Sequence, residues 1–371
     1  MTSGVSKGHG GHETRNLLMS KWNISILPLA AAAIVFKILR CNPELVFITS
    51  AVALVPLAGL IGKTTEELAG HVGPTAGGLL NATMGNVTEL VIGIVALWGG
   101  QTEVVKASIT GSIIGNLLLV FGFAAFVGGI GREKLVFSRL AAGANLSMLF
   151  LAVVALVMPA LFQLSVFGSL QATGGRIERL SLYASGILLF SYFCSLIFVF
   201  RTHRGLFSAG KGEPPSLSKG AALTGLVAAT VLTAIVSEVL VSQIEPATRA
   251  FGWTDLFVGL VVVATVGNAA EHSTAIMMAR RNQMDLALNV AIGSSTQIAL
   301  FVGPLLVVIS QFHSSPMSLV FHPLEIAAII LSVGAVALVA MDGETHWFEG
   351  IQLLGVYSIL VVFFYYLPAS R

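Results

Sequence analysis

A five-residue motif with an asparagine and a glutamate occurs twice in this chain, in matching register. The first copy is Gly85-Asn86-Val87-Thr88-Glu89 and the second is Gly267-Asn268-Ala269-Ala270-Glu271. A Gly-Ser pair follows each copy at the same distance, as Gly111-Ser112 and Gly293-Ser294. Both motifs lie inside long apolar runs, where a carboxylate is costly to bury and indicates a function. Two buried acids placed by an internal repeat are typical of a secondary transporter.

The composition identifies the solvent in which this chain folds. Of the 371 residues, 55% are apolar and 10% are charged, against about 25% charged in an ordinary soluble domain. A water-soluble protein could not bury that much apolar surface, so a polytopic protein of the lipid bilayer is expected. Cys41 and Cys194 are the only cysteines. Because Cys194 lies within an apolar run, neither a disulfide framework nor a cysteine-rich metal site is expected.

Hydropathy predicts an all-α fold with eleven transmembrane helices. Each apolar segment is close to the length of roughly 20 residues that crosses the hydrocarbon. The expected spans are 24–39, 44–62, 74–99, 104–130, 138–163, 181–200, 220–242, 254–279, 285–311, 323–341 and 347–367. Residues 1–22 lack the apolar stretch and cleavage site of a signal peptide, and a disordered cytoplasmic tail is expected there.

The spans divide into one extra helix and two repeats. The predicted parts are a first transmembrane helix at 23–42, a five-helix repeat at 43–200, a cytoplasmic linker at 201–219 and a second five-helix repeat at 220–371. A repeat with an odd number of spans re-enters the membrane from the opposite side, so the second copy is inverted relative to the first. Equivalent mid-helix residues of inverted repeats converge, and Glu89 and Glu271 are therefore expected to meet near the bilayer centre.

Lysine and arginine indicate the orientation. When the sides of the membrane alternate along the predicted spans, 13 of the 20 Lys and Arg residues fall on the side of the N-terminus. Positive charge accumulates on the cytoplasmic side, so the N-terminus is expected to be cytoplasmic. A bacterial plasma membrane is the expected location, with a vacuolar membrane as the alternative. A homo-oligomer is left open.

Each motif offers a carboxylate with an amide beside it, because residues three apart share one face of a helix. One alternative is a polar pair that only holds helices together, but the duplication favours a function. Further hydroxyl and amide oxygens come from the fourth and ninth spans, and such oxygens suit a hard cation. These supporting residues are Ser112, Asn116, Ser294 and Gln297. Thr110 and Ser295 are expected to bond back to helix carbonyls instead.

His272 follows Glu271 directly, and adjacent residues on a helix point about 100° apart. The two side chains cannot easily bind one ion together. A zinc hydrolase would have two histidines around the acid, as His-Glu-x-x-His, and the chain lacks that pattern. We therefore expect His272 to be a hydrogen-bond partner or a proton-path residue rather than a metal ligand.

Segments 77–90, 267–272 and 284–301 together resemble the calcium/proton antiporters of the cation/proton exchanger family, within the calcium/cation antiporter superfamily. The resemblance extends from about Pro28 to Leu367. It implies eleven spans in two inverted repeats. In that family the glutamate of each Gly-Asn-x-x-Glu motif binds calcium and exchanges it for protons, which implies this role for Glu89 and Glu271. The implied supporting positions are Asn86, Asn268, Ser112, Asn116, Ser294 and Gln297.

Two positions depart from that family. Gly115 stands where family members often have a serine, and Val263-Ala264-Thr265 stands where a proline often breaks the second motif helix. The resemblance therefore does not by itself imply an oxygen ligand at position 115 or a helix break at positions 263–265.

The expected function is secondary active antiport of Ca²⁺ against H⁺ by alternating access, and not enzymatic catalysis. Ca²⁺ and protons would compete for the carboxylate oxygens of the two acids, so Ca²⁺ and H⁺ are the expected substrates. No ATP-binding loop, cofactor site or nucleic-acid-binding feature is present in the sequence. Three alternatives stay open: an antiporter of the same fold for another cation such as Mn²⁺ or Na⁺, an intramembrane metalloenzyme that uses Glu271 and His272, and a channel.

Overall fold

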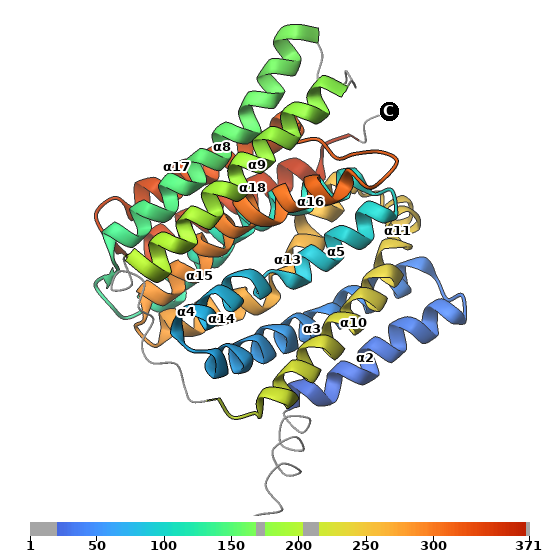
Figure 1. The fold of residues 1–371 in the computed structure, drawn as a ribbon, viewed down its shortest axis with the longest axis horizontal. Coiled ribbons are helices and arrows are strands. Elements are labelled where there is room, and N and C mark those ends of the chain that lie inside the picture. The colour runs from blue at the N-terminus through green and yellow to red at the C-terminus, as the bar shows by residue number, and fades with distance from the viewer. Residues whose placement is uncertain (1–20, 168–174, 203–214, 369–371) are drawn as a thin grey trace, which may run out of the picture.

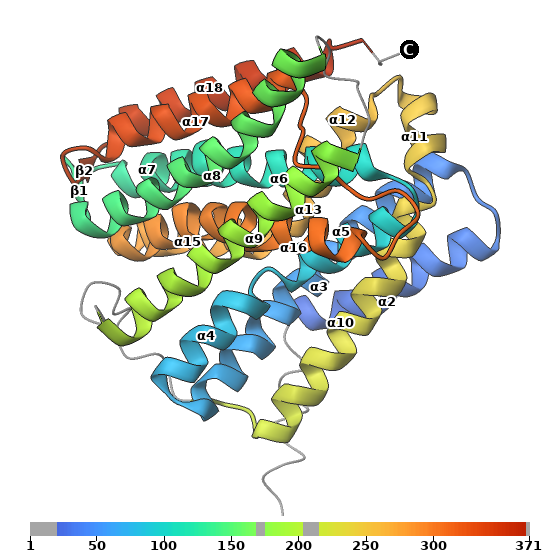
Figure 2. The same ribbon diagram turned by 45° about the horizontal axis from the view of Figure 1, so that its top comes forward.

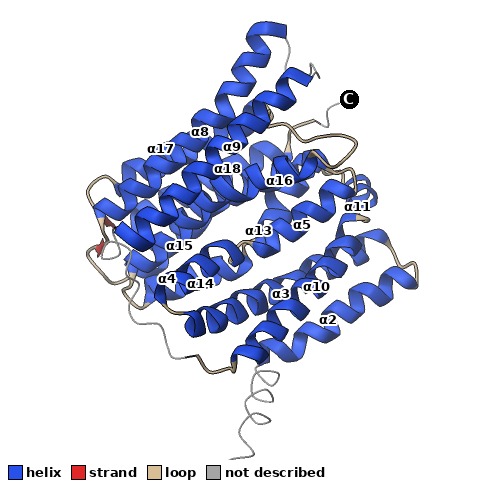
Figure 3. Ribbon diagram, viewed as in Figure 1, coloured by secondary structure: helices blue, strands red, loops and turns tan. Residues whose placement is uncertain are grey.

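The computed structural model describes residues 21–167, 175–202 and 215–368. The predicted N-terminal tail falls outside these residues up to residue 20, as do positions 203–214 of the predicted linker. The described residues form helices, with one pair of short strands between them (Figure 3).

The helices follow one another in two groups, separated by the linker (Figure 1). Before the linker they are α2 (Lys21–Ile38), α3 (Pro43–Val72), α4 (Pro74–Met84), α5 (Val87–Trp98), α6 (Thr102–Ile114), η1 (Gly115–Val120), α7 (Phe121–Gly129), α8 (Arg139–Phe167), α9 (Gly175–Ile197) and η2 (Phe198–Thr202). After it they are α10 (Lys219–Val241), α11 (Ile244–Phe251), α12 (Asp255–Phe257), η4 (Val258–Val263), α13 (Ala264–Gly267), α14 (Ala269–Arg280), α15 (Met284–Gln297), η5 (Ile298–Val302), α16 (Gly303–Ser310), α17 (Pro323–Ala340) and α18 (Trp347–Tyr365). The η segments are π-helical stretches that continue neighbouring α-helices. Strands β1 (Leu135–Val136) and β2 (Glu344–Thr345) pair antiparallel, with Leu135 opposite Thr345.

Nine helices in the described ranges are long and apolar enough to cross a membrane, judged by length and composition. A tenth span would join Ile244–Phe251 to Asp255–Gly267, which are bent by 111° against each other, and Ile26–Ile38 is a shorter apolar helix. The helical membrane architecture predicted from the sequence is thus confirmed, while the count of eleven stays a prediction. The predicted span 44–62 is too short, because α3 continues to Val72. None of the glycines within α3 has a positive φ, so none of them ends the helix. The helix ends at its C-cap, Gly73, which has a φ of 86°.

The backbone repeats in the same register as the motifs. Helix α5 covers Val87–Trp98 and its counterpart α14 covers Ala269–Arg280. The following turns also match, because Gly100 has φ of 77° and Asn282 has φ of 61°. The next helices, α6 and α15, again begin at equivalent positions, Thr102 and Met284. Two segments of different sequence therefore adopt the same helix–turn–helix geometry.

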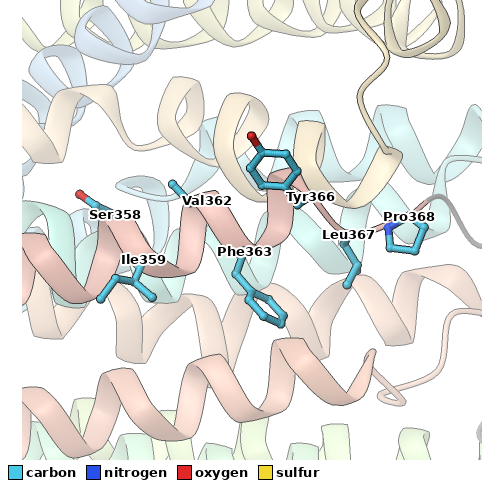
Figure 4. A pocket seen from close by; sticks show the side chains of 7 residues that line it. All are labelled: Ser358, Ile359, Val362, Phe363, Tyr366, Leu367 and Pro368. Carbon is cyan, nitrogen blue, oxygen red and sulfur yellow. The ribbon is translucent and has the colours of Figure 1, made fainter.

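Helices α2, α3 and α10 pack on one another and form one group beside the rest of the molecule (Figure 2). Helix α6 lies in the interior and packs closely against η4, where a Cβ on Gly111 would lie 2.0 Å from the carbonyl oxygen of Leu260. Helix α18 is at the periphery. The side chains near its end form an open apolar face that suits contact with lipid tails (Figure 4).

Candidate cation site

The motif asparagines lie at breaks between two helices. Helix α4 ends before Asn86 and α5 begins after it, and Asn268 separates α13 from α14 in the same way. The two residues have nearly the same non-helical backbone, with φ and ψ of −98° and 20° at Asn86 and −92° and 12° at Asn268. Each motif helix is therefore broken at its asparagine, and in the second repeat the break forms without the proline that family members often have.

The two motif acids occupy the first turn of the helices that begin at these breaks. Glu89 lies in the first turn of α5 and Glu271 in the first turn of α14. The N-terminal end of a helix carries partial positive charge, which favours a carboxylate. The sequence thus places each acid three residues beyond its asparagine, where the backbone stabilises its negative charge.

Glu89 of the first repeat packs against the motif of the second repeat. A Cβ on Gly267 would lie 3.1 Å from Cγ of Glu89. Glu271 belongs to the same motif, four residues beyond Gly267. Both carboxylate oxygens of Glu89 and Oε2 of Glu271 are buried and have no hydrogen-bond partner among the described residues. The structure therefore brings Glu89 to the motif that contains Glu271, while direct contact of the two carboxylates stays a prediction.

The motif amides are joined to the Gly-Ser helices of the opposite repeat. Asn268 Nδ2 donates to Ser112 Oγ at 2.8 Å. In the equivalent pair, Ser294 Oγ donates to Asn86 Oδ1 at 3.4 Å. Each asparagine thus contacts the serine of the other half of the molecule. This reciprocal pairing is what a pseudo-two-fold axis through the site produces.

Two further amides join these pairs into one continuous network. Asn116 Nδ2 donates to Asn268 Oδ1 at 3.0 Å and to Ser294 Oγ at 3.1 Å. Asn86 Nδ2 donates to Gln297 Oε1. All six supporting polar residues predicted from the motifs and the Gly-Ser helices are therefore hydrogen-bonded to one another. The imidazole of His272 takes no part in these hydrogen bonds, so its role as a partner or proton-path residue stays a prediction.

A small cavity adjoins Glu89. The centre of a water-sized sphere can occupy about 10 Å³ inside it, which is roughly the space needed for one water molecule or ion. The residues that line it are Glu89, Ile92, Ser108, Ser112, Val263 and Gly267. Asn116 Oδ1, in the adjoining network, is also a buried acceptor without a partner among the described residues.

This arrangement is chemically suited to a hard cation or to protons. In the described structure it contains four buried acceptor oxygens without a donor, from Glu89, Glu271 and Asn116, although buried polar atoms are normally paired. Carboxylate, amide and hydroxyl oxygens are the ligands that Ca²⁺ uses. No group of three or more His, Cys, Asp or Glu side chains with metal-binding geometry occurs in the described part of the chain. The oxygens of amides and hydroxyls would thus have to complete any coordination shell.

The buried Glu325 makes two hydrogen bonds near the site that were not predicted. Its Oε1 accepts from Thr110 at 2.8 Å, and its Oε2 accepts from the backbone nitrogen of His322 at 2.9 Å. The expected bond of Ser295 to the carbonyl of Ala291 is present, whereas the expected bond of Thr110 to its own helix is replaced by the one to Glu325. Glu325 caps the start of α17. Its place three residues after His322 is the signal that could have identified it.

The chain matches the model of the sodium/calcium exchanger protein family over residues 44–201 and 221–366. A protein of Synechocystis named "Ca(2+)/H(+) antiporter" is 42% identical over 342 residues, which cover 87% of this chain and 91% of that protein. The "Vacuolar calcium ion transporter" of Schizosaccharomyces pombe is 38% identical over 360 residues, which cover 96% of this chain and 87% of the relative.

The fold also matches solved structures. The structure of native YfkE superposes with a TM-score of 0.81 at 36% sequence identity, covering 93% of this chain and all of the other. The resemblance to calcium/proton antiporters seen in the motifs is confirmed by these matches. The chain belongs to the sodium/calcium exchanger protein family.

Proposed function

We propose that this protein is a secondary active antiporter that exchanges Ca²⁺ for H⁺ across a membrane, with Glu89 and Glu271 binding the cation or the protons in turn. One observation carries the proposal: Glu89 packs on the motif of the opposite repeat that contains Glu271, and three buried carboxylate oxygens of these two acids have no donor among the described residues. The relatives named as Ca²⁺/H⁺ antiporters support the same substrates.

Charge balance explains why the two ions would compete. A divalent cation that leaves water needs about two negative charges, and the two glutamates would supply them. Without the cation, two close carboxylates repel one another and lack water, so protons bind in its place. The neutral site would then open alternately to the two sides of the membrane, carrying Ca²⁺ in one direction and protons in the other.

The supporting network would hold the two broken motif helices, and with them the acids, in place while the charge of the acids changes. Asn86, Asn268, Ser112, Ser294, Asn116 and Gln297 bond mainly to one another. The unpartnered Oδ1 of Asn116 is, among the described residues, the amide oxygen most readily available as a further ligand. We propose Ca²⁺ only as the transported substrate, without a resident cofactor and without an enzymatic reaction.

The orientation and the membrane belong to the same proposal. We propose a cytoplasmic N-terminus and a cytoplasmic 201–219 linker, because Lys and Arg are in excess on that side of the predicted spans. We favour a bacterial plasma membrane, with a vacuolar membrane as the alternative that the Schizosaccharomyces pombe relative supports.

The test is calcium uptake into proteoliposomes with an imposed pH gradient. We expect Glu89→Gln and Glu271→Gln to lower exchange by about 100-fold or more, because one charge of the divalent cation would stay uncompensated in the site, at an effective cost of several kcal/mol. Glu103→Gln is the matched control, because this side chain is 69% exposed. Exchange that survives in both motif variants would contradict the assigned roles. A requirement for Na⁺ with no response to the pH gradient would indicate sodium coupling, and competition with Mn²⁺ would reveal a different preferred cation.

A further inference from the structure

The carbonyl groups of Ala82 and Ala264 are equivalent in the repeat, yet they have different partners. Each precedes its motif asparagine by four residues. The Ala264 oxygen accepts from the backbone nitrogen of Asn268 at 3.1 Å and from its side-chain Nδ2 at 2.8 Å. The Ala82 oxygen instead accepts from the hydroxyl of Tyr192 at 3.0 Å. In the first repeat this carbonyl therefore receives its side-chain hydrogen bond from Tyr192, which lies outside the motif. In the second repeat it receives that bond from the motif asparagine itself.

Tyr192 is the deepest large side chain of a peripheral helix. It lies on α9, whose other tyrosine, Tyr183, is 68% exposed, whereas Tyr192 is 2% exposed. Its ring stacks on Phe301 in η5, with ring centroids 5.0 Å apart and planes at 23°. Phe301 is four residues, about one helical turn, beyond Gln297. Tyr192 thus contacts the two segments that carry Asn86 and Gln297, through its hydroxyl and its ring respectively.

The different partners leave the two motif amides in different states. Asn268 divides its amide between the Ala264 carbonyl and Ser112. Asn86 makes no such bond to Ala82 in the described structure and donates to Gln297 instead. In the first repeat the side-chain donor to the Ala82 carbonyl is thus the hydroxyl of Tyr192, while the Asn86 amide is bonded to Gln297.

We propose that Tyr192 is a positioning residue for the candidate cation site, and this inference rests on the proposed function. By capping the carbonyl end of α4 it keeps the Asn86 amide on Gln297 and so joins the broken motif helix of the first repeat to α15 of the second. The two halves of the site then differ, because the first depends on α9 and the second depends only on its own asparagine.

We expect the removal of the Tyr192 hydroxyl alone to change the hydrogen bonds around Asn86 and the KM for Ca²⁺. In Tyr192→Phe the Ala82 carbonyl loses its donor, and the Asn86 amide can turn onto it as Asn268 does onto Ala264. Gln297 then loses the bond that positions it. We expect the KM for Ca²⁺ to rise about 5- to 10-fold, the size of the loss of one buried hydrogen bond, while the maximal exchange rate changes by less than about twofold.

The experiment compares Tyr192→Phe with Tyr183→Phe, which removes a hydroxyl from the exposed face of the same helix. Both are assayed for exchange in proteoliposomes, and hydrogen exchange is measured at the backbone amides around Asn86. We expect the KM to rise and the amides to exchange faster only in Tyr192→Phe. In the double variant with Gln297→Ala, the Tyr192→Phe change should add little to the KM, because the bond that it protects is already absent.

Three results would overturn the proposal. The first is a Tyr192→Phe protein that matches Tyr183→Phe in both KM and hydrogen exchange. The second is a loss of thermal stability and rate at unchanged KM, which indicates a structural role only. The third is full additivity with Gln297→Ala. If the unmodified protein and Tyr183→Phe exchange no Ca²⁺, the proposed function fails, and the hydrogen exchange still decides whether Tyr192 positions the break at Asn86.

Discussion

Gly111 and Gly293 are equivalent glycines with opposite surroundings, and they allow a sharp test of how the two repeats pack. A Cβ at Gly111 would lie 2.0 Å from the carbonyl oxygen of Leu260 and 2.6 Å from its carbonyl carbon. At Gly293 a Cβ would meet nothing within 4 Å. The same substitution by alanine therefore tests a backbone contact at one position and open space at the other.

The magnitude follows from the geometry. Ordinary van der Waals contact begins near 3.4 Å, so an alanine methyl at Gly111 would overlap the Leu260 carbonyl deeply and force α6 and η4 apart. The obstacle is backbone, which cannot rotate away as a side chain can. Overpacking costs about 1–3 kcal/mol and occasionally more, and alanine returns up to about 1 kcal/mol in helix propensity. Because the overlap is with backbone, the cost lies at the upper end of that range, and we expect a net loss of about 2 kcal/mol or more in Gly111→Ala.

The control should move the other way. Gly293→Ala gains the helix propensity without the clash, so its free energy of unfolding should stay equal or rise by about 0.5–1 kcal/mol. The assay is the apparent melting temperature of purified protein in detergent, with a fall of about 2.5 °C or more expected for Gly111→Ala in a chain of 371 residues. Equal melting temperatures for the two variants would refute the close approach of α6 and η4.

Three other changes test separate parts of the fold. Asn268→Ala removes the hydrogen-bond partner of Ser112 and one of the two partners of Asn116, which keeps Ser294, and should lower the free energy of unfolding by about 1–3 kcal/mol, measured by thermal unfolding; an unchanged melting temperature would contradict the network. Glu67 accepts hydrogen bonds from the backbone and hydroxyl of Ser216 at 2.7 and 2.6 Å, so Glu67→Ala should increase tryptic cleavage of the adjoining linker, and equal cleavage would argue against this attachment. Glu344, 2.8 Å from Lys134, raises the pKa of that lysine above its usual 10.5; the pair therefore stabilises the protein below pH 10.5 and loses this effect as the pH rises through the higher folded value. Glu344→Gln should lower the melting temperature slightly at neutral pH and not above that range, and a difference that grows with pH would have the wrong sign.

The site could be predicted from the sequence because its main residues are repeated. Duplication distinguished Glu89 and Glu271 from incidental buried acids, and the constant spacing between the copies identified Ser112 and Ser294 as partners. The exchange of partners between repeats also follows from inversion, since a two-fold axis brings each asparagine to the serine of the other half.

Sequence analysis missed Glu325 because it has no counterpart in the repeat. The position equivalent to Glu325 is Gly143, which has no side chain to accept a hydrogen bond. A pattern search based on symmetry cannot find residues that break the symmetry. Thr110 was assigned a local bond to its own helix because that bond is always within reach, whereas its actual acceptor, Glu325, depends on the packing of α17 against α6.

The energetics of the two acids explain why such a site would exchange ions instead of standing empty. The first turn of a helix stabilises a carboxylate by about 0.3–1 kcal/mol, and by at most about 2 in a partly buried position. The effective cost of burying each ion is several kcal/mol, so the dipoles of α5 and α14 offset only part of it. Amides and hydroxyls add further dipoles but no net charge, and among the described residues no lysine or arginine lines the cavity beside Glu89. The missing positive charge must arrive with the cargo, as a cation that binds both acids or as protons that neutralise them.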